Sequence, residues 1–224
     1  DEVLLQWMEQ YPRTDTQQLG RINIQAEELD AGLISPTARF DVLQDGADVI
    51  LHNQEASAAI VVDPVQVVTG TNVQLPGQAS IAMGGGTVAI LAPTDGMLWV
   101  VAFADIGGFS PENTEPVAEL GPAAAVEVGR DGTVHAVSTS DGQQVTIAPL
   151  DEGGFAEPVV RERAELRSMQ EPRVSVLGGE AVVLDPPSST LLVPGGAVPV
   201  PEGGAAQQVG DASDTVLLAT PTQL

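Results

Sequence analysis

The stretch from Val126 to Leu150 reads VEVGRDGTVHAVSTSDGQQVTIAPL and holds three short apolar runs separated by two turns. Both turns contain an Asp-Gly pair, at 131–132 and at 141–142. Tight hairpin turns favour this pair because their central residues need a positive φ. The apolar runs are rich in Val and Ala and are bounded by turn residues, as short strands are. The stretch therefore predicts three antiparallel β-strands joined by two hairpins.

The same pattern occurs in three further stretches of the chain, from Phe40 to Pro64, from Ser80 to Phe103 and from Val174 to Gly196, and a fifth copy begins at Gln207. Two landmarks recur at the same steps of 40, 46 and 47 residues. They are the first turn, at Gly46, Gly86, Gly132 and Gly179, and the second turn, near Glu55, Asp95, Asp141 and Ser188. A repeat of this length built from short strands is typical of β-propeller blades.

The variable stretch after each third strand, such as 72–77 or 115–121, can supply a fourth, outer strand. We therefore predict an all-β fold, a β-propeller with four-stranded blades of about 40–47 residues. A β-sandwich has strands of similar length and spacing, but it does not predict one register repeated over four units. The charged stretch 156–170 fits either a helix or an outer strand followed by a charged loop of the third complete blade.

Residues 1–224 are expected to form a single propeller domain or a fragment of one. Its units are 1–38 (partial), 39–78, 79–122, 123–171, 172–204 and 205–224 (partial). Both ends look like incomplete blades, and propellers close by completing one blade with strands from the two ends. The ring is then either five-bladed or, as we favour, an incomplete part of a larger one.

Composition excludes several kinds of chemistry. The chain has 31 acidic and 8 basic residues, a net charge of −23, no cysteine and two histidines, and every basic residue is arginine. Lysine-dependent catalysis, thiolate chemistry and three-histidine metal sites are therefore ruled out. A surface this negative repels nucleic acid. Residues 64–94 carry no charge, but their polar residues and the Gly84–Gly86 run exclude a membrane helix, so we expect no direct membrane insertion by this segment.

His52 and His135 are the first candidates for a site, because imidazole is a common metal ligand and acid–base group. They lie in blades that are not adjacent, so a buried or hydrogen-bonded structural role is favoured. Asp45, Asp95, Asp131 and Asp141 all lie in turns, where an aspartate usually binds the local backbone. No calcium-loop spacing and no G-x-S-x-G motif occurs. We therefore expect no catalytic residue, no cofactor and no metal.

Two charged groups complete the candidates. Glu27, Glu28 and Asp30 form a small acidic cluster, and Glu162 and Glu165 alternate with Arg161, Arg163 and Arg167. Both groups are typical of solvated faces. The second group is the only local concentration of positive charge, which also suits an acidic partner or a neighbouring domain.

Residues 19–64 resemble the propeller-like region of large actinobacterial surface proteins. The resemblance lies in Arg21 and Asn23, in Glu28-Leu29-Asp30, in Phe40 to Gln44 and in Asp63-Pro64, and it continues through Ser80 to Val101. In that family a membrane-anchored N-terminus leads into a propeller, followed by fibronectin type III or Ig-like domains. The resemblance implies an extracytoplasmic, membrane-tethered, multidomain protein whose anchor lies outside this segment.

These observations favour a non-catalytic propeller that acts as an interaction or spacer domain, with a protein partner or neighbouring domains of the same chain as its contacts. The alternative is a propeller enzyme of the quinoprotein or metal-dependent lactonase type, in which channel carboxylates hold a divalent ion. An intracellular scaffold is a third interpretation. The two main hypotheses differ in whether acidic or histidine side chains of several blades converge on one point.

Overall fold

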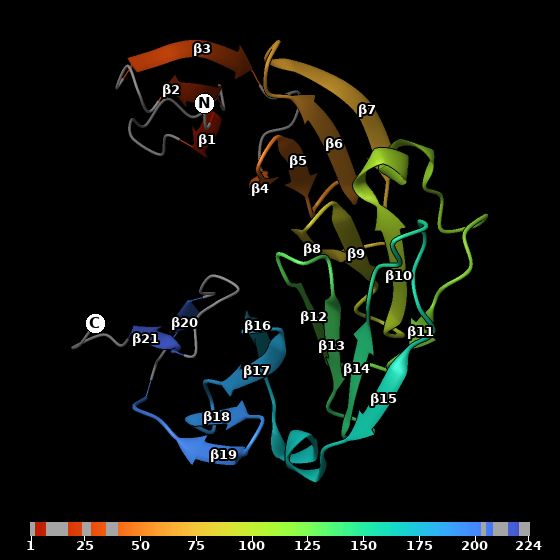
Figure 1. Cartoon of the computed structure of the whole chain (residues 1–224), viewed down its shortest axis with the longest axis vertical. Helices are drawn as coiled ribbons and strands as arrows, with labels where there is room; N and C mark the ends of the chain where they lie inside the picture. The colour runs from red at the N-terminus through yellow and green to blue at the C-terminus, as the bar shows by residue number, and fades with distance from the viewer. Residues whose placement is uncertain are drawn as a thin grey trace. The chain divides into compact units, whose positions relative to one another are not determined.

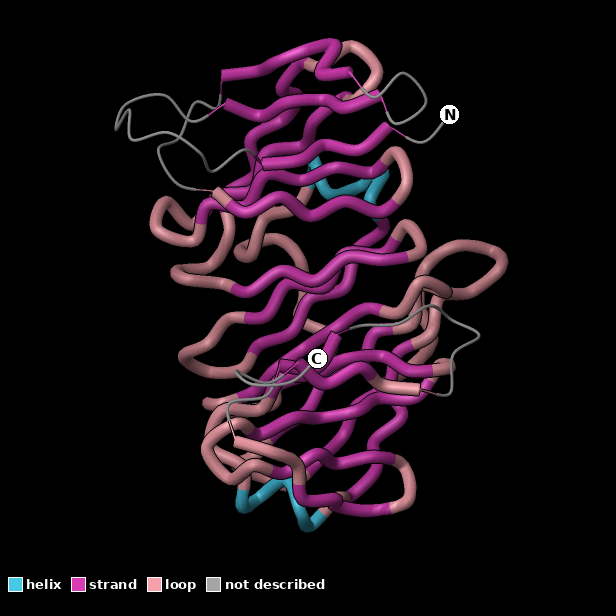
Figure 2. Tube along the Cα trace, turned by 90° about the vertical axis from the view of Figure 1, so that its left-hand side faces the viewer, coloured by secondary structure: helices cyan, strands magenta, loops and turns pink. Residues whose placement is uncertain are grey.

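The structure is a computed structural model that describes residues 3–7, 18–23, 28–34, 40–202, 205–207 and 215–219. Strands make up nearly all of its regular structure, and the two helical segments are short 3-10 helices (Figure 2). None of the helices in the described ranges is long and apolar enough to span a bilayer. The chain separates into two compact units, Asp1–Ala79 with Phe103–Asn113, and Ser80–Ala102 with Thr114–Leu224.

The first unit contains two antiparallel sheets and the 3-10 helix η1 (Phe103–Gly108). The sheet of three strands consists of β1 (Val3–Trp7), β2 (Gln18–Asn23) and β3 (Glu28–Ile34). The sheet of four strands, blade I, consists of β4 (Asp41–Asp45), β5 (Asp48–Asn53), β6 (Ala58–Asp63) and β7 (Val68–Gln74). Each strand pairs with its neighbour in sequence, as the repeated hairpins predict.

The second unit contains three further four-stranded blades and one pair of short strands (Figure 1). Blade II consists of β8 (Ser80–Gly84), β9 (Thr87–Leu91), β10 (Met97–Ala102) and β11 (Ala118–Glu119). Blade III consists of β12 (Ala124–Val128), β13 (Val134–Ser138), β14 (Gln143–Ile147) and β15 (Val159–Glu162), and the 3-10 helix η2 (Ala164–Ser168) follows it. Blade IV consists of β16 (Arg173–Leu177), β17 (Glu180–Asp185), β18 (Thr190–Val193) and β19 (Gly196–Pro199). The pair is β20 (Ala205–Gln207) and β21 (Leu217–Ala219).

The repeat keeps its register through all four blades. The second hairpin of every blade has a four-residue turn. The residue pairs that flank this turn are Asn53–Ala58, Ala92–Met97, Ser138–Gln143 and Asp185–Thr190. The first hairpin closes at Asp45–Asp48, Gly84–Thr87, Gly129–Thr133 and Leu177–Glu180. Every second strand is therefore six residues long between the two turns, so a position in one blade can be compared directly with its equivalents.

Neighbouring blades of the second unit pack face to face. One apolar cluster joins Ala89, Leu91 and Leu98 of blade II to residues of blade III such as Val134 and Ala136, all of them buried. A second cluster joins Val137 of blade III to blade IV, through Val174, Ala181, Val183 and Leu192. Burial of each leucine or valine in these clusters stabilises the fold by about 1.5–3 kcal/mol. The core of this unit thus lies between sheets.

Two turns of neighbouring blades approach so closely that only glycine fits. A Cβ atom on Gly96, in the second turn of blade II, would overlap the backbone of Gly121, which precedes blade III. A Cβ atom on Gly85, in the first turn of blade II, would overlap the turn of blade III at Gly132. Both residues also have a positive φ, +71° at Gly96 and +52° at Gly85. These glycines allow backbone to pack against backbone between blades.

The structure confirms the predicted all-β propeller blades and decides the open alternative at 156–170. This stretch forms the outer strand β15 and the five-residue η2, so the strand interpretation holds and a long helix does not. The outer strand predicted at 72–77 begins earlier, at Val68, and the one predicted at 115–121 is only two residues long.

Candidate functional site

His135 is the least explained polar side chain of the described residues. It lies on β13 and is 1% exposed, and neither Nδ1 nor Nε2 has a hydrogen-bond partner within the described part of the chain. By register it occupies the position of Ile50, Ala89 and Val182 in the other blades, which are all fully buried aliphatic residues. A histidine thus stands where the repeat otherwise places an apolar side chain.

Acidic groups surround this histidine. Glu127 lies directly opposite it on β12, and the carboxylates of Asp131 and Glu180 also act on it. Burial lowers the pKa of His135, and the Asp131 and Glu180 charges oppose that shift only in part. Burial also raises the pKa of Glu127, whose Oε1 accepts a hydrogen bond of 3.0 Å from the Val128 amide. A neutral imidazole is therefore the favoured state of His135 at neutral pH.

We expect His135→Val to make unfolding of the protein less sensitive to acid. Because the pKa of His135 is lowered in the folded state, the unfolded chain takes up this proton first as the pH falls below about 6.5. The wild-type protein then loses stability by up to about 1.4 kcal/mol per pH unit through this group, and the variant does not. Urea unfolding at several pH values between 7.5 and 5 measures the difference. If the unfolding free energies of the two proteins changed in parallel with pH, this role would be contradicted. A cavity left by the smaller valine alone would lower the stability by the same amount at every pH.

His52 has surroundings of a different kind. It lies on β5 opposite Asp41, is 7% exposed, and its Nε2 has no hydrogen-bond partner among the described residues. Burial lowers its pKa, while the Asp41 carboxylate and a hydrogen bond with the Ala79 backbone oppose the shift. In the repeat it corresponds to Val137 of β13, two residues beyond the position of His135. The two histidines therefore do not occupy equivalent positions.

The described residues contain no group of three or more histidine, aspartate or glutamate side chains placed to hold a metal ion. The expected backbone role of the turn aspartates is confirmed at two positions. Asp95 Oδ1 accepts from the Met97 amide at 3.1 Å, and Asp131 accepts from both the amide and the hydroxyl of Thr133 at 2.9 Å. Asp45 lies opposite Asp48. Burial raises the pKa of Asp48, and the negative charge of Asp45 adds a smaller shift in the same direction.

One polar position, not identified from the sequence, recurs at the end of the second strand. Asn53 Oδ1 accepts from the Ala56 amide at 2.8 Å, and Ser138 Oγ donates to the Leu120 carbonyl at 2.5 Å. In blade IV, Asp185 Oδ1 accepts from the amides of Gln170 and Glu171 at 3.0 and 2.8 Å. These side chains hold the turn of their own blade or the segment that precedes it. Aligning the blades by strand register identifies this shared position.

Asp185 is fully buried. Burial alone would raise the pKa of its carboxyl group. The proximity of Ser188 and the hydrogen bonds from the amides of Glu171 and Gln170 outweigh the effect of burial and lower the pKa, while Oδ2 has no hydrogen-bond partner among the described residues. The carboxylate is thus stabilised in its charged form by the backbone that it organises.

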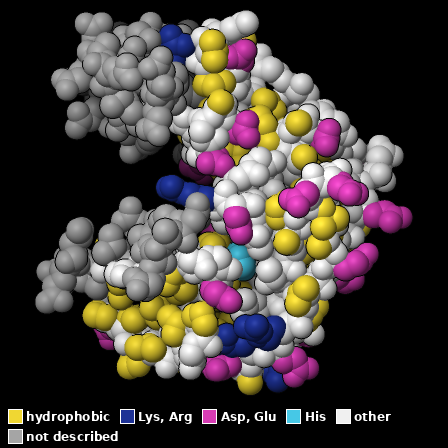
Figure 3. Space-filling model, in the orientation of Figure 1, with side chains coloured by type: hydrophobic (Ala, Val, Ile, Leu, Met, Phe, Trp, Pro, Cys, Tyr) yellow, Lys and Arg dark blue, Asp and Glu magenta, His cyan; other side chains and the backbone are white. Residues whose placement is uncertain are grey.

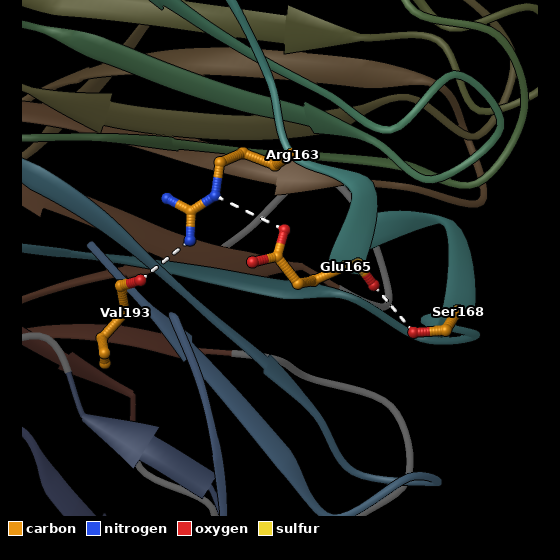
Figure 4. Close-up of polar contacts among 4 residues, drawn as sticks. All are labelled: Arg163, Glu165, Ser168 and Val193. Atoms are coloured by element: carbon orange, nitrogen blue, oxygen red, sulfur yellow. Dashed lines mark hydrogen bonds and ion pairs between the residues drawn. The ribbon is translucent and has the colours of Figure 1, made fainter. Parts of the chain in front are cut away.

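Arginine side chains bind carbonyl groups of neighbouring segments. Arg163 lies between Glu165 Oε2, at 3.8 Å, and the Val193 carbonyl of blade IV, which its Nη2 reaches at 2.9 Å (Figure 4). Arg167 Nη2 donates to the Asp141 carbonyl at 2.9 Å. The side chain of Arg163 is only 11% exposed, so the predicted solvated face is wrong for this residue. Of the other predicted cluster, Glu27 and the side chains of Glu28 and Asp30 lie outside the described residues.

The first unit contains a similar contact, built from residues of the surface-protein resemblance. Arg21 Nη1 donates to the carbonyls of Pro64 and Val65 at 3.1 and 2.7 Å. Asp63 Oδ1 accepts from the amides of Val65 and Gln66 at 2.8 and 2.9 Å and so shapes this turn. Arg21 and Asp63-Pro64 therefore connect the three-stranded sheet to blade I, and their role there is structural.

The outer surface is acidic, with a few exposed apolar side chains. Figure 3 shows acidic side chains scattered over the described surface and few basic ones. Three of the exposed large apolar residues belong to blade III: Val159 (67% exposed) and Val160 (54%) lie on the outer strand β15, and Leu150 (50%) lies in the loop between β14 and β15. Trp99, by contrast, is buried on β10, and its indole donates to the Thr114 carbonyl at 2.9 Å.

No protein-family model and no curated protein matches this sequence. Solved structures do match it. The complex of KlAtg21 with the coiled-coil of AgAtg16 aligns at a TM-score of 0.64 and 12% identity, over 97% of this chain and 73% of that one. Virginiamycin B lyase from Staphylococcus aureus aligns at 0.53 and 12%, over 97% and 77%. BBS1N in complex with ARL6DN aligns at 0.51 and 12%, over 92% and 70%.

At this level of identity the comparisons bear on fold alone. The lyase and BBS1N are β-propellers, and the propellers that this chain resembles include both enzymes and interaction domains. The repeated four-stranded antiparallel blades and these similarities together identify the chain as a β-propeller.

Proposed function

We propose that this propeller is a non-catalytic interaction or spacer domain of an extracytoplasmic, multidomain cell-surface protein. The observation that carries the proposal is the outer strand β15 of blade III, whose free edge carries Val159 and Val160, both more than half exposed. Exposed apolar side chains beside an unpaired strand edge favour binding of another chain at that edge. The proposed partner is another protein or a neighbouring domain of the same chain.

The use of the polar side chains supports the same proposal. Ser138 and Asp185, both fully buried, bind the protein's own backbone, and so does Arg163. These groups stabilise turns and blade contacts, and their hydrogen bonds are made within the chain. Among the similar folds, the KlAtg21 and BBS1N propellers are seen in protein complexes.

The cellular part of the proposal is tested on the full-length parent protein in its own cells. Protease added to intact cells is expected to cleave the protein, and the protein is expected to fractionate with the cell envelope. A cytosolic control protein in the same cells must stay intact. Full protection of the propeller until the cells are lysed would contradict an extracytoplasmic location and favour an intracellular scaffold.

The non-catalytic part is tested by thermal unfolding of the 224-residue chain with calcium, manganese, zinc or a quinone cofactor. A ligand at about 100 times its dissociation constant stabilises the folded state by about 2.7 kcal/mol, which raises Tm by several degrees. We expect no such shift with any of the four. A clear shift with one of them would overturn the proposal and favour the quinoprotein or lactonase type of enzyme.

A further inference from the structure

The outer edges of the four blades differ in how they are protected from pairing with another strand. Unpaired edge strands are usually short, interrupted, or blocked by proline. In blade I the pairing of β7 with β6 shifts register between Ile60 and Val62. In blade II the outer strand β11 has two residues. In blade IV β19 ends at Pro199, and Pro201 follows two residues later.

β15 of blade III has neither a register shift nor a proline between its ends. It pairs with β14 over all four residues, from Gln143–Glu162 to Thr146–Val159. None of the strands in the described part of the chain pairs with its other edge, and all four of its residues are exposed. Because only one edge of a strand is used in such a pair, alternate N–H and C=O groups of β15 face outward.

The strand is also held firmly in place. The amide of Arg163, the residue that follows β15, donates to the Gly142 carbonyl at 2.7 Å. The guanidinium of the same residue reaches the Val193 carbonyl, and Arg167 reaches the Asp141 carbonyl. The C-terminal end of β15 and the helix η2 that follows it are thus fixed to blades III and IV. A template ordered in advance loses less conformational entropy when another strand binds.

The side chains of β15 specify what that strand must be. Val159 and Arg161 lie on one face of the sheet, and Val160 and Glu162 lie on the other, because side chains alternate along a strand. An antiparallel strand would therefore place one residue opposite each of these four. Opposite charges and apolar pairs stabilise such cross-strand contacts, and like charges destabilise them.

We propose that β15 binds an extended segment of a partner protein as a fifth, antiparallel strand of blade III. The segment has the sequence pattern basic–acidic–apolar–apolar, so that its first residue lies opposite Glu162 and its second opposite Arg161. The two apolar residues then cover Val160 and Val159. This mode of recognition uses main-chain hydrogen bonds for affinity and alternate side chains for specificity. It rests on the proposed interaction function and names the surface and the chemistry of the partner.

The test uses two synthetic peptides, acetyl-TKEVVT-amide and its charge-swapped form acetyl-TEKVVT-amide. Each is titrated into the isotope-labelled 224-residue protein, and amide chemical shifts are followed by NMR. We expect the first peptide to bind about tenfold more tightly than the second, since two cross-strand charge pairs change sign. The shift changes are expected on β15 and on β14.

The double variant Arg161→Glu, Glu162→Arg is the matched control. Both side chains are exposed, so the variant is expected to keep the Tm of the wild type, and its peptide preference is expected to reverse. Equal affinity for the two peptides, or no shift change with either, would overturn the proposal. The wild type could instead self-associate as its concentration rises. If the double variant kept this self-association and Glu162→Arg alone removed it, the proposal would be overturned, and the occupant of the β15 edge would be a second copy of this chain. Failure of this test leaves the protease-accessibility result untouched, so the two proposals fail separately.

Discussion

Gly96→Ala is expected to destabilise the second unit by about 3–4 kcal/mol, the largest effect of any single methyl group that we consider. Gly96 has a φ of +71°, which an L-residue adopts at a cost, and its new Cβ would overlap the backbone of Gly121. The backbone there is further fixed, because the Leu120 amide donates to the Gly96 carbonyl at 2.9 Å. Chemical unfolding monitored by tryptophan fluorescence measures the loss.

Two other glycines of the second unit separate the cost of the positive φ from the cost of the overlap with neighbouring backbone. Gly86 has a φ of +72°, but no atom lies within 4 Å of the position that a Cβ would take, so Gly86→Ala reports the backbone conformation alone, about 1 kcal/mol. Gly195 has neither a positive φ nor a close neighbour, and Gly195→Ala should change stability by less than about 0.5 kcal/mol. If Gly96→Ala cost no more than Gly86→Ala, the close approach of the two blades would be refuted.

Asp185→Ala is expected to destabilise the second unit by about 3 kcal/mol. The change removes the charged acceptor of two partly buried hydrogen bonds, from the Gln170 and Glu171 amides, and a hydrogen bond to a charged group contributes about 1.5–3 kcal/mol. Asp185→Asn keeps the Oδ1 acceptor and should lose less than half as much. Unfolding free energies of the two variants at pH 7 give the comparison.

The contribution of Asp185 also depends on pH. Because the pKa of its carboxyl is lowered in the folded state, the stabilisation is present above the ordinary aspartate pKa and is lost as the pH falls below about 4. The gap between wild type and Asp185→Ala should therefore narrow in acid. An equal loss in the alanine and asparagine variants would show that the two amides do not depend on this acceptor.

The sequence was sufficient to predict the fold because the fold is local and repeated. Asp-Gly pairs at 131–132 and 141–142 mark hairpin turns, and alternation with Val and Ala marks the strands between them. The outer strands were harder to place. β7 begins at Val68, and most of its residues are polar because an outer strand has little apolar area to bury. Its start therefore cannot be predicted from an apolar pattern.

The candidate site was less predictable, because its features depend on how sheets stack. His135 is buried because β13 is covered on both faces, by blade II on one and by blade IV on the other, and the alternation along a single strand does not reveal this stacking. Arg163 stands in a run of alternating charges that is typical of an exposed face, yet its guanidinium reaches a carbonyl thirty residues later. Contacts of this kind join segments that no local pattern connects.

The arginine contacts have a consequence for the conditions that the fold withstands. Arg21, Arg163 and Arg167 donate to main-chain carbonyls, which carry no ionisable proton, and a guanidinium stays protonated throughout the physiological range. Mobile ions weaken pairs of opposite full charges more than they weaken hydrogen bonds to a neutral acceptor. These contacts between segments should therefore hold at high salt concentration as well as in dilute buffer.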